Sequence, residues 1–258
     1  MANLQSLRES LRSGKVTVGS WITLAHPAIA EIMAKAGFDW LVVDLEHSVI
    51  SLREAEELIR VIESCGLTPL VRLSSNDAVQ IKRVMDAGAY GVIVPMVNSR
   101  EDAERAVAAV RYPPIGKRGV GLARAQGYGT RFDDYKAWLE RESVVIVQVE
   151  HIKAVENLSQ IVSADGVDGF MVGPYDLSGS LGVPGQFEHP RMVEALAEVQ
   201  KVALARKAVP GYHVVSPRPE LVIEKIKEGY KFIAYGIDML FLDEMCRCGL
   251  MEIREQKW

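Results

Sequence analysis

The chain has 258 residues, of which 48% are hydrophobic and 25% are charged, and its formal net charge is −4 at pH 7. This composition excludes a mostly disordered chain, which would be poorer in apolar residues. The slight excess of acid argues against nucleic-acid binding, because a protein that binds phosphate backbones needs positive charge. The length suits one barrel of about 250 residues.

The cysteine count and the N-terminus predict a cytoplasmic protein without a membrane segment. The three cysteines are an odd number without the spacing of a disulfide framework or a zinc site: Cys65, Cys246 and Cys248. The first residues are polar and lack the apolar core of a signal peptide. No apolar run approaches the roughly 20 residues that cross a bilayer.

Eight short apolar runs recur along the chain and predict eight strands. They lie near Val18–Thr23, Asp39–Asp44, Pro69–Leu73, Tyr90–Pro95, Val144–Val149, Val167–Val172, Val209–Val214 and Phe232–Tyr235. Several are apolar on consecutive residues rather than alternately, which is typical of parallel strands covered on both faces.

Amphipathic segments separate these runs and predict helices. The clearest cover Ile29–Ala36, Leu52–Ser64, Ala78–Ala87, Ala103–Val110 and Met192–Arg206. Eight alternations predict a single α/β domain over residues 1–258, a (β/α)8 TIM barrel. An open doubly wound sheet is the alternative, but the nearest match to its Gly-rich turn, Gly119–Arg124, lacks the last glycine. We expect the glycine-rich stretch Arg111–Arg131 to be a long, functional βα connection.

Polar residues stand where the apolar runs stop, which predicts an active site at the carboxyl ends of the strands. The runs lead into Asp44-Leu45-Glu46-His47, Arg72, Gln148-Val149-Glu150, Gly173-Pro174-Tyr175-Asp176, Tyr212-His213 and Asp238. The amino ends of the same runs carry no comparable set.

Glu150 and Asp176 follow neighbouring strands of the predicted barrel. Two carboxylates that converge in this way suit a hard divalent cation, Mg²⁺ or else Mn²⁺ or Co²⁺, with water or substrate completing the shell. The alternative is that both are surface acids or helix N-caps.

Arg72 ends a buried strand, so its guanidinium needs an anionic partner. It could form a structural ion pair with Glu46 or Asp44, or it could stabilise a developing enolate or carboxylate. His47 follows Asp44 by three residues and predicts an acid/base oriented by that carboxylate, although a capped loop histidine is the alternative. His213 could also reach the mouth.

None of the eight runs contains a lysine, and Lys231 abuts the last run at its amino end. A Schiff-base aldolase needs a desolvated lysine at the mouth of the barrel. Stabilisation of a carbanion would therefore depend on the cation, acting as a Lewis acid.

These segments, in this order and spacing, resemble the HpcH/HpaI aldolases, the class II metal-dependent pyruvate aldolases. The strongest markers are Ala36–Trp40 with Asp44–His47, Val71-Arg72, Val94–Val97, Arg111–Pro114 with Gly116–Gly119, Gln148–Glu150, Gly166–Gly169 and Gly173–Ser178. The resemblance extends from about Gly19 to about Leu242 and implies reversible cleavage of a 2-keto-4-hydroxy acid into pyruvate and an aldehyde.

The resemblance also implies the site. Glu150 and Asp176 would hold the cation, Arg72 would stabilise the enolate oxygen, and His47 with Asp44 would act as acid/base. Gln148 would line the pyruvate pocket, while backbone amides near Gly173 and Asp176, in the segment with Pro174 and Tyr175, would hold the carboxylate. A homo-hexamer with exchanged C-terminal helices is implied as well.

Three alternatives stay open from the sequence. Oxaloacetate decarboxylation produces the same enolate. A citryl- or malyl-CoA-type lyase of the same superfamily would need a basic extension for coenzyme A, which is not evident. A catalytically silent metabolite-binding barrel is disfavoured by the joint presence of the acidic, arginine and histidine candidates. The segments around Arg124–Gly129, Gly211–Ser216 and Asp238–Leu240 depart from familiar members, so the acceptor aldehyde stays unassigned.

Overall fold

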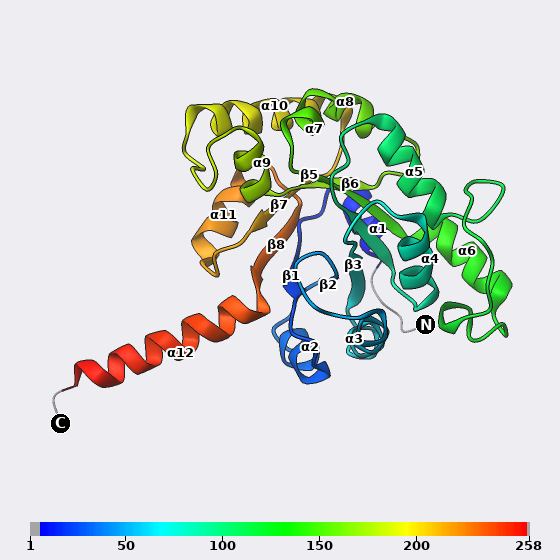
Figure 1. Ribbon diagram of the computed structural model, residues 1–258, viewed down its shortest axis with the longest axis horizontal. Coiled ribbons are helices and arrows are strands. Elements are labelled where there is room, and N and C mark those ends of the chain that lie inside the picture. Colours follow the sequence, from blue (N-terminus) through cyan, green and yellow to red (C-terminus); the bar gives the residue numbers. More distant parts are fainter. Residues whose placement is uncertain (1–5, 257–258) are drawn as a thin grey trace.

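The computed structural model describes residues 6–256, and its eight parallel strands close into one barrel in chain order (Figure 1). All eight predicted strands are present, so the (β/α)8 barrel is confirmed. The strands are β1 (Thr17–Ile22), β2 (Trp40–Asp44), β3 (Thr68–Arg72), β4 (Gly91–Val94), β5 (Val144–Val149), β6 (Gly169–Val172), β7 (Pro210–Val214) and β8 (Phe232–Ile237).

Helices alternate with these strands and cover the barrel. They are α1 (Leu7–Arg12), α2 (Pro27–Ala34), α3 (Leu52–Ser64), α4 (Ala78–Asp86), α5 (Arg100–Val110), the 3₁₀ turn η1 (Arg124–Gln126), α6 (Phe132–Glu142), α7 (Ile152–Glu156), α8 (Leu158–Ile161), α9 (Pro174–Ser180), α10 (Pro190–Arg206), α11 (Pro219–Lys227) and α12 (Asp238–Glu255). The predicted helix at Leu52–Ser64 has the observed bounds. Others begin earlier because a capping side chain precedes the apolar pattern, as Ser99 does for α5.

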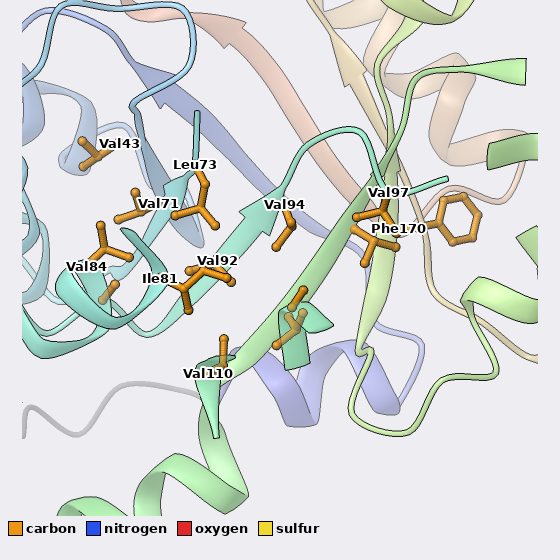
Figure 2. Close-up of a cluster of buried hydrophobic side chains, with 14 of the residues drawn as sticks. Val43, Val71, Leu73, Ile81, Val84, Val92, Val94, Val97, Val110 and Phe170 are labelled. Carbon is orange, nitrogen blue, oxygen red and sulfur yellow. The ribbon is translucent and has the colours of Figure 1, made fainter. Parts of the chain in front are cut away.

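Apolar side chains fill both sides of the sheet. Outside the barrel, valines of β2, β3 and β4 pack against Ile81 and Val84 of α4 (Figure 2). Inside, the Trp40 ring stacks on Phe232 with centroids 4.2 Å apart. Every residue of β2 and β3 is buried, which holds the polar residues at the ends of these strands in fixed positions.

Helix α1 closes the amino end of the barrel. Leu7 and Leu11 join the interior cluster, and the Arg8 guanidinium donates to Asp168 at 2.6 Å, with both side chains buried. The carboxyl end is therefore the end at which the barrel interior opens.

The stretch Arg111–Arg131 is not a βα connection, so that prediction was wrong. It follows α5 and precedes α6, which places it at the amino side of the barrel. Arg118 in this stretch is buried and donates to Asp86 at the end of α4, at 2.5 Å. The stretch does lie between the fourth and fifth strands, but the helix predicted at Ala103–Val110 precedes it and already returns the chain to the amino side.

Helix α12 projects from the barrel at the C-terminal end of the chain (Figure 1). Several large apolar side chains on it are exposed, among them Leu242, Met245, Leu250 and Met251. Between residues 6 and 256 the structure has no helix that is both long and apolar enough to cross a bilayer.

Candidate active site at the carboxyl end of the barrel

A cavity of about 290 Å³ lies at the carboxyl ends of the strands. Its wall contains nearly all the residues predicted from the sequence: Asp44, His47, Arg72, Gln148, Gly173, Pro174, Tyr175, Asp176 and His213. Glu150 is buried at its edge, within hydrogen-bonding contact of Gln148. Trp21 also lines the cavity, although nothing in the sequence marked it as a residue of the site.

Arg72 and Asp44 are register partners on β3 and β2, and they form a two-point ion pair. Arg72 Nε donates to Asp44 Oδ1 at 2.8 Å and Nη2 donates to Oδ2 at 2.6 Å. The guanidinium carbon lies 4.2 Å from the ring centroid of Trp21. The ion pair considered from the sequence is thus present, and it holds the guanidinium in the wall of the cavity.

The pKa of Asp44 is lowered in this environment. Burial on its own raises it, but the hydrogen bond and charge of Arg72 and the backbone N–H groups of Glu46 and His47 outweigh burial. Asp44 is therefore ionised, and it fixes the orientation of Arg72.

Glu150 directly follows β5, and both of its carboxylate oxygens accept hydrogen bonds. The backbone N–H of Met96 donates to Oε1 at 2.6 Å, and the Gln148 amide donates to Oε2. Met96 adopts a left-handed φ of 52°. Sequence reasoning did not identify this contact, because nothing in the sequence around Met96 signals that conformation.

The pKa of Glu150 is raised to about 7, chiefly by burial, with the charges of Glu46 and Asp176 adding to the effect. The pKa of Glu46 is also raised to about 7 by burial, and Asp44 and Asp176 add to it while Arg72 opposes them. Glu46, considered only as a partner for Arg72 in the sequence, is thus a third carboxylate of the site.

These residues fit a divalent cation. Neighbouring negative charge adds to the raised pKa of Glu46 and of Glu150, and a cation beside these carboxylates would offset that repulsion. Glu46 Oε2 and Gln148 Oε1 are buried oxygens that complete no hydrogen bond within residues 6–256. In the same range no three His, Cys, Asp or Glu side chains converge as a full ligand set, so water or substrate would complete the coordination.

Asp176 is exposed and lies in the first turn of α9, whose N-cap is Gly173. Asp176 is therefore not the N-cap of α9. At Gly173, an added Cβ would lie 3.2 Å from Gln148 Nε2 and 3.3 Å from Glu150 Oε2. A glycine at this position lets the chain pass close to the Glu150 carboxylate.

His47 lies at the rim, with 61% of its side chain exposed. Asp44 Oδ1 accepts the backbone N–H of His47 at 3.3 Å, and the ring Nε2 lies 3.8 Å from Glu46 Oε2. Asp44 therefore positions the His47 backbone, while Glu46 is the carboxylate beside the imidazole.

His213 is buried, with Nε2 3.3 Å from the Gly236 carbonyl oxygen and its ring centroid 5.2 Å from that of Trp21. Burial, followed by the charge of Arg72, lowers the pKa of His213 to about 3. The ring is thus neutral at physiological pH, and Nε2–H donates to Gly236.

Comparison with known proteins identifies the family of the chain. The model of the HpcH/HpaI aldolase/citrate lyase family matches residues 17–243. The chain belongs to the HpcH/HpaI aldolase/citrate lyase family. This membership confirms the expected enzyme class, a carbon–carbon lyase of the class II pyruvate aldolase type.

Relatives of this HpcH/HpaI chain are similar over nearly their whole length. It is 38% identical over 240 residues to a 4-hydroxy-2-oxo-heptane-1,7-dioate aldolase of Salmonella dublin, covering 92% of this chain and 90% of that protein. It is 40% identical over 232 residues to a hydroxypyruvate/pyruvate aldolase of Sagittula stellata, covering 90% of each. The crystal structure of a family member from Burkholderia cenocepacia superposes with a TM-score of 0.91 at 32% identity, covering 96% of this chain and 98% of that one.

Proposed function

We propose that the protein reversibly cleaves a 2-keto-4-hydroxy acid to pyruvate and an aldehyde, with a divalent cation held by Glu150 and Asp176. The observation that carries this proposal is that a guanidinium and several carboxylates meet at one cavity. Arg72 lies in the cavity wall, held by Asp44. Glu46 and Glu150 lie beside it, and neighbouring negative charge adds to the raised pKa of each.

Glu150 and Asp176 would hold Mg²⁺, or Mn²⁺ or Co²⁺, as oxygen ligands. When bound, the cation supplies Lewis acidity that polarises the keto group of the substrate. Glu46 adds negative charge that favours a cation over an anion at this point. Gln148, through the oxygen that completes no hydrogen bond among the described residues, would contribute to the pyruvate pocket.

The remaining residues move a proton and stabilise charge. His47, exposed at the rim beside Glu46, would take the proton of the 4-hydroxyl as the C3–C4 bond breaks. The electron pair of that bond forms the C2–C3 double bond of an enolate, whose negative charge lies on the former keto oxygen and is stabilised by the Arg72 guanidinium. Return of the proton from His47 to C3 would then give pyruvate. Backbone amides near Gly173 and Asp176 would hold the carboxylate. Condensation reverses these steps.

The assembly we infer is a homo-oligomer, a hexamer, in which α12 is exchanged between subunits. It is supported by the projection of α12 from its own barrel (Figure 1) and by the exposed apolar residues along that helix, which need a covering surface.

All three cysteines are free and exposed, which supports a reducing compartment, the cytoplasm.

Proton exchange at the pyruvate methyl group tests the proposal. The purified protein is incubated with pyruvate in D₂O, with Mg²⁺, with Mn²⁺ or with chelator, and the methyl signal is followed by NMR. We expect metal-dependent exchange that Arg72→Ala abolishes. Exchange that survives chelation and is trapped by borohydride would indicate a lysine imine instead. No exchange under any of these conditions would favour a silent metabolite-binding barrel.

A further inference from the structure

A second, larger cavity of about 720 Å³ adjoins the active-site cavity. It lies between β7, α10 and α11, and we call it the β7 cavity. Four residues line both cavities: Pro174, Tyr175, His213 and Val215. The two cavities therefore border each other at these four residues.

The wall of the β7 cavity carries aromatic faces and hydroxyl groups. The rings of Tyr212 and Tyr230 meet edge to face with centroids 5.1 Å apart, and Tyr175 packs on Phe187 in the same way at 5.0 Å. Burial raises the pKa of both Tyr212 and Tyr230, so their hydroxyls stay protonated and can donate.

Polar groups of this wall have unused hydrogen-bonding capacity. The Tyr230 hydroxyl is buried beside the Gln200 side chain, and neither the hydroxyl nor the Gln200 amide nitrogen completes a hydrogen bond of normal geometry within residues 6–256. Such buried groups gain from a ligand that supplies hydroxyl partners.

The charges of the wall disfavour an anion. Three carboxylates line it, those of Glu188, Glu224 and Glu228. Its two cations are already paired: Lys225 Nζ lies 2.8 Å from Glu228 Oε2 and Arg218 Nε lies 3.9 Å from Glu220 Oε1. A ligand with a terminal carboxylate would therefore meet repulsion here rather than a partner.

We propose that the β7 cavity binds the uncharged, hydroxylated carbon tail of the acceptor aldehyde, with His213 at the passage from the active site. The inference rests on the proposed aldolase function and names its acceptor class. The aromatic faces would cover the carbon chain, and Tyr212 with Gln200 would bind its hydroxyls.

Three aldehydes of equal chain length test this inference in aldol addition to pyruvate: erythrose, butanal and succinic semialdehyde. We expect kcat/KM for erythrose to exceed that for each of the others by about tenfold, because unpaired polar groups discriminate against analogues that lack hydroxyls. Glycolaldehyde, which is too short to enter the β7 cavity, serves as the reference acceptor.

Substitutions in the wall of the β7 cavity test whether this cavity is the source of the preference for a hydroxylated acceptor. Leu196→Trp narrows the β7 cavity, and Tyr212→Phe removes one hydroxyl with little change in shape. Each should lower the erythrose-to-glycolaldehyde ratio of kcat/KM by about tenfold. Glu194→Trp, exposed on the same helix and outside this wall, should change the ratio less than twofold.

Pyruvate methyl exchange separates the two levels of the proposal. If methyl exchange is intact in the variants but the erythrose-to-glycolaldehyde ratio of kcat/KM is unchanged, the β7 cavity does not bind the acceptor tail and the aldolase function stands. A preference for succinic semialdehyde would lead to the same conclusion. If the unaltered protein shows no exchange, both the aldolase function and the proposed role of the β7 cavity are refuted.

Discussion

The side chain of Arg72 combines two properties that only a guanidinium offers in this position. Its two parallel N–H groups match the Asp44 carboxylate, and its flat face lies over Trp21. Glu46 Oε2 lies 3.4 Å from the same Nε. The charge is thus held in place before substrate arrives, which is the condition under which it stabilises a developing oxyanion.

Arg72→Lys keeps the charge but loses the paired hydrogen bonds and the flat contact. We expect the rate of pyruvate methyl exchange to fall roughly 10²–10³-fold. Arg60→Lys, in the exposed ion pair with Glu56 on α3, is the matched control and should retain its rate. An Arg72→Lys protein with nearly full activity would show that the geometry of the guanidinium is unimportant.

The buried His213 predicts how stability depends on pH. Its folded-state pKa of about 3 lies below the ordinary 6.5, so the unfolded chain binds a proton there that the folded chain does not. Stability is therefore lost as pH falls from about 6.5 towards 3. His213→Gln retains a donor for the Gly236 carbonyl group. Between these pH values, the free energy of unfolding of this variant should depend on pH less steeply, by about 1.4 kcal/mol per pH unit.

Urea unfolding of both proteins between pH 4 and pH 8 measures the difference, because the other titrating groups contribute equally to both. Parallel curves for the unaltered protein and His213→Gln would contradict the assignment of a neutral, buried ring.

Helix α1 supports the barrel from the end opposite the active site. Its apolar residues close the barrel interior, and Arg8 is the buried partner of Asp168, which also accepts the backbone N–H of Val145 at 3.0 Å. The Arg8–Asp168 pair thus links α1 to β5, the strand that Glu150 follows.

Arg8→Ala would leave Asp168 buried without its closest cation. We expect a loss of about 3–5 kcal/mol in the free energy of unfolding. Arg12→Ala removes a cation that is 3.8 Å from the same carboxylate but 64% exposed, and it should cost less than about 1 kcal/mol. Equal effects of the two substitutions on chemical unfolding would refute a special role for the buried pair.

At the scale of the whole molecule, α12 is the element that its own barrel does not cover (Figure 1). The double variant Leu242→Glu/Met245→Glu places charge on its exposed apolar surface. In light scattering after size exclusion, we expect a hexamer for the unaltered protein and a smaller species for this variant. Glu252→Gln, a polar change on the same helix, is the control. An unchanged mass for the double variant would contradict exchange of α12.

The parts of the molecule that the sequence predicted are those that depend on local patterns. The runs of β2 and β5 are apolar on consecutive residues because both faces are covered, and this pattern located the strands and the polar residues that end them. The contacts of Met96 and Glu46 with the site depend instead on a left-handed backbone and on burial. The β7 cavity depends on how α10 and α11 pack, which no local pattern encodes.

The most direct test of the account is titration of the protein with Mn²⁺, followed by electron paramagnetic resonance of the free ion. We predict one tight site per subunit, lost in Glu150→Gln and in Asp176→Asn but kept in His47→Gln, whose side chain lies at the rim. Tight binding that survives both carboxylate substitutions, or its absence in the unaltered protein, would contradict the account.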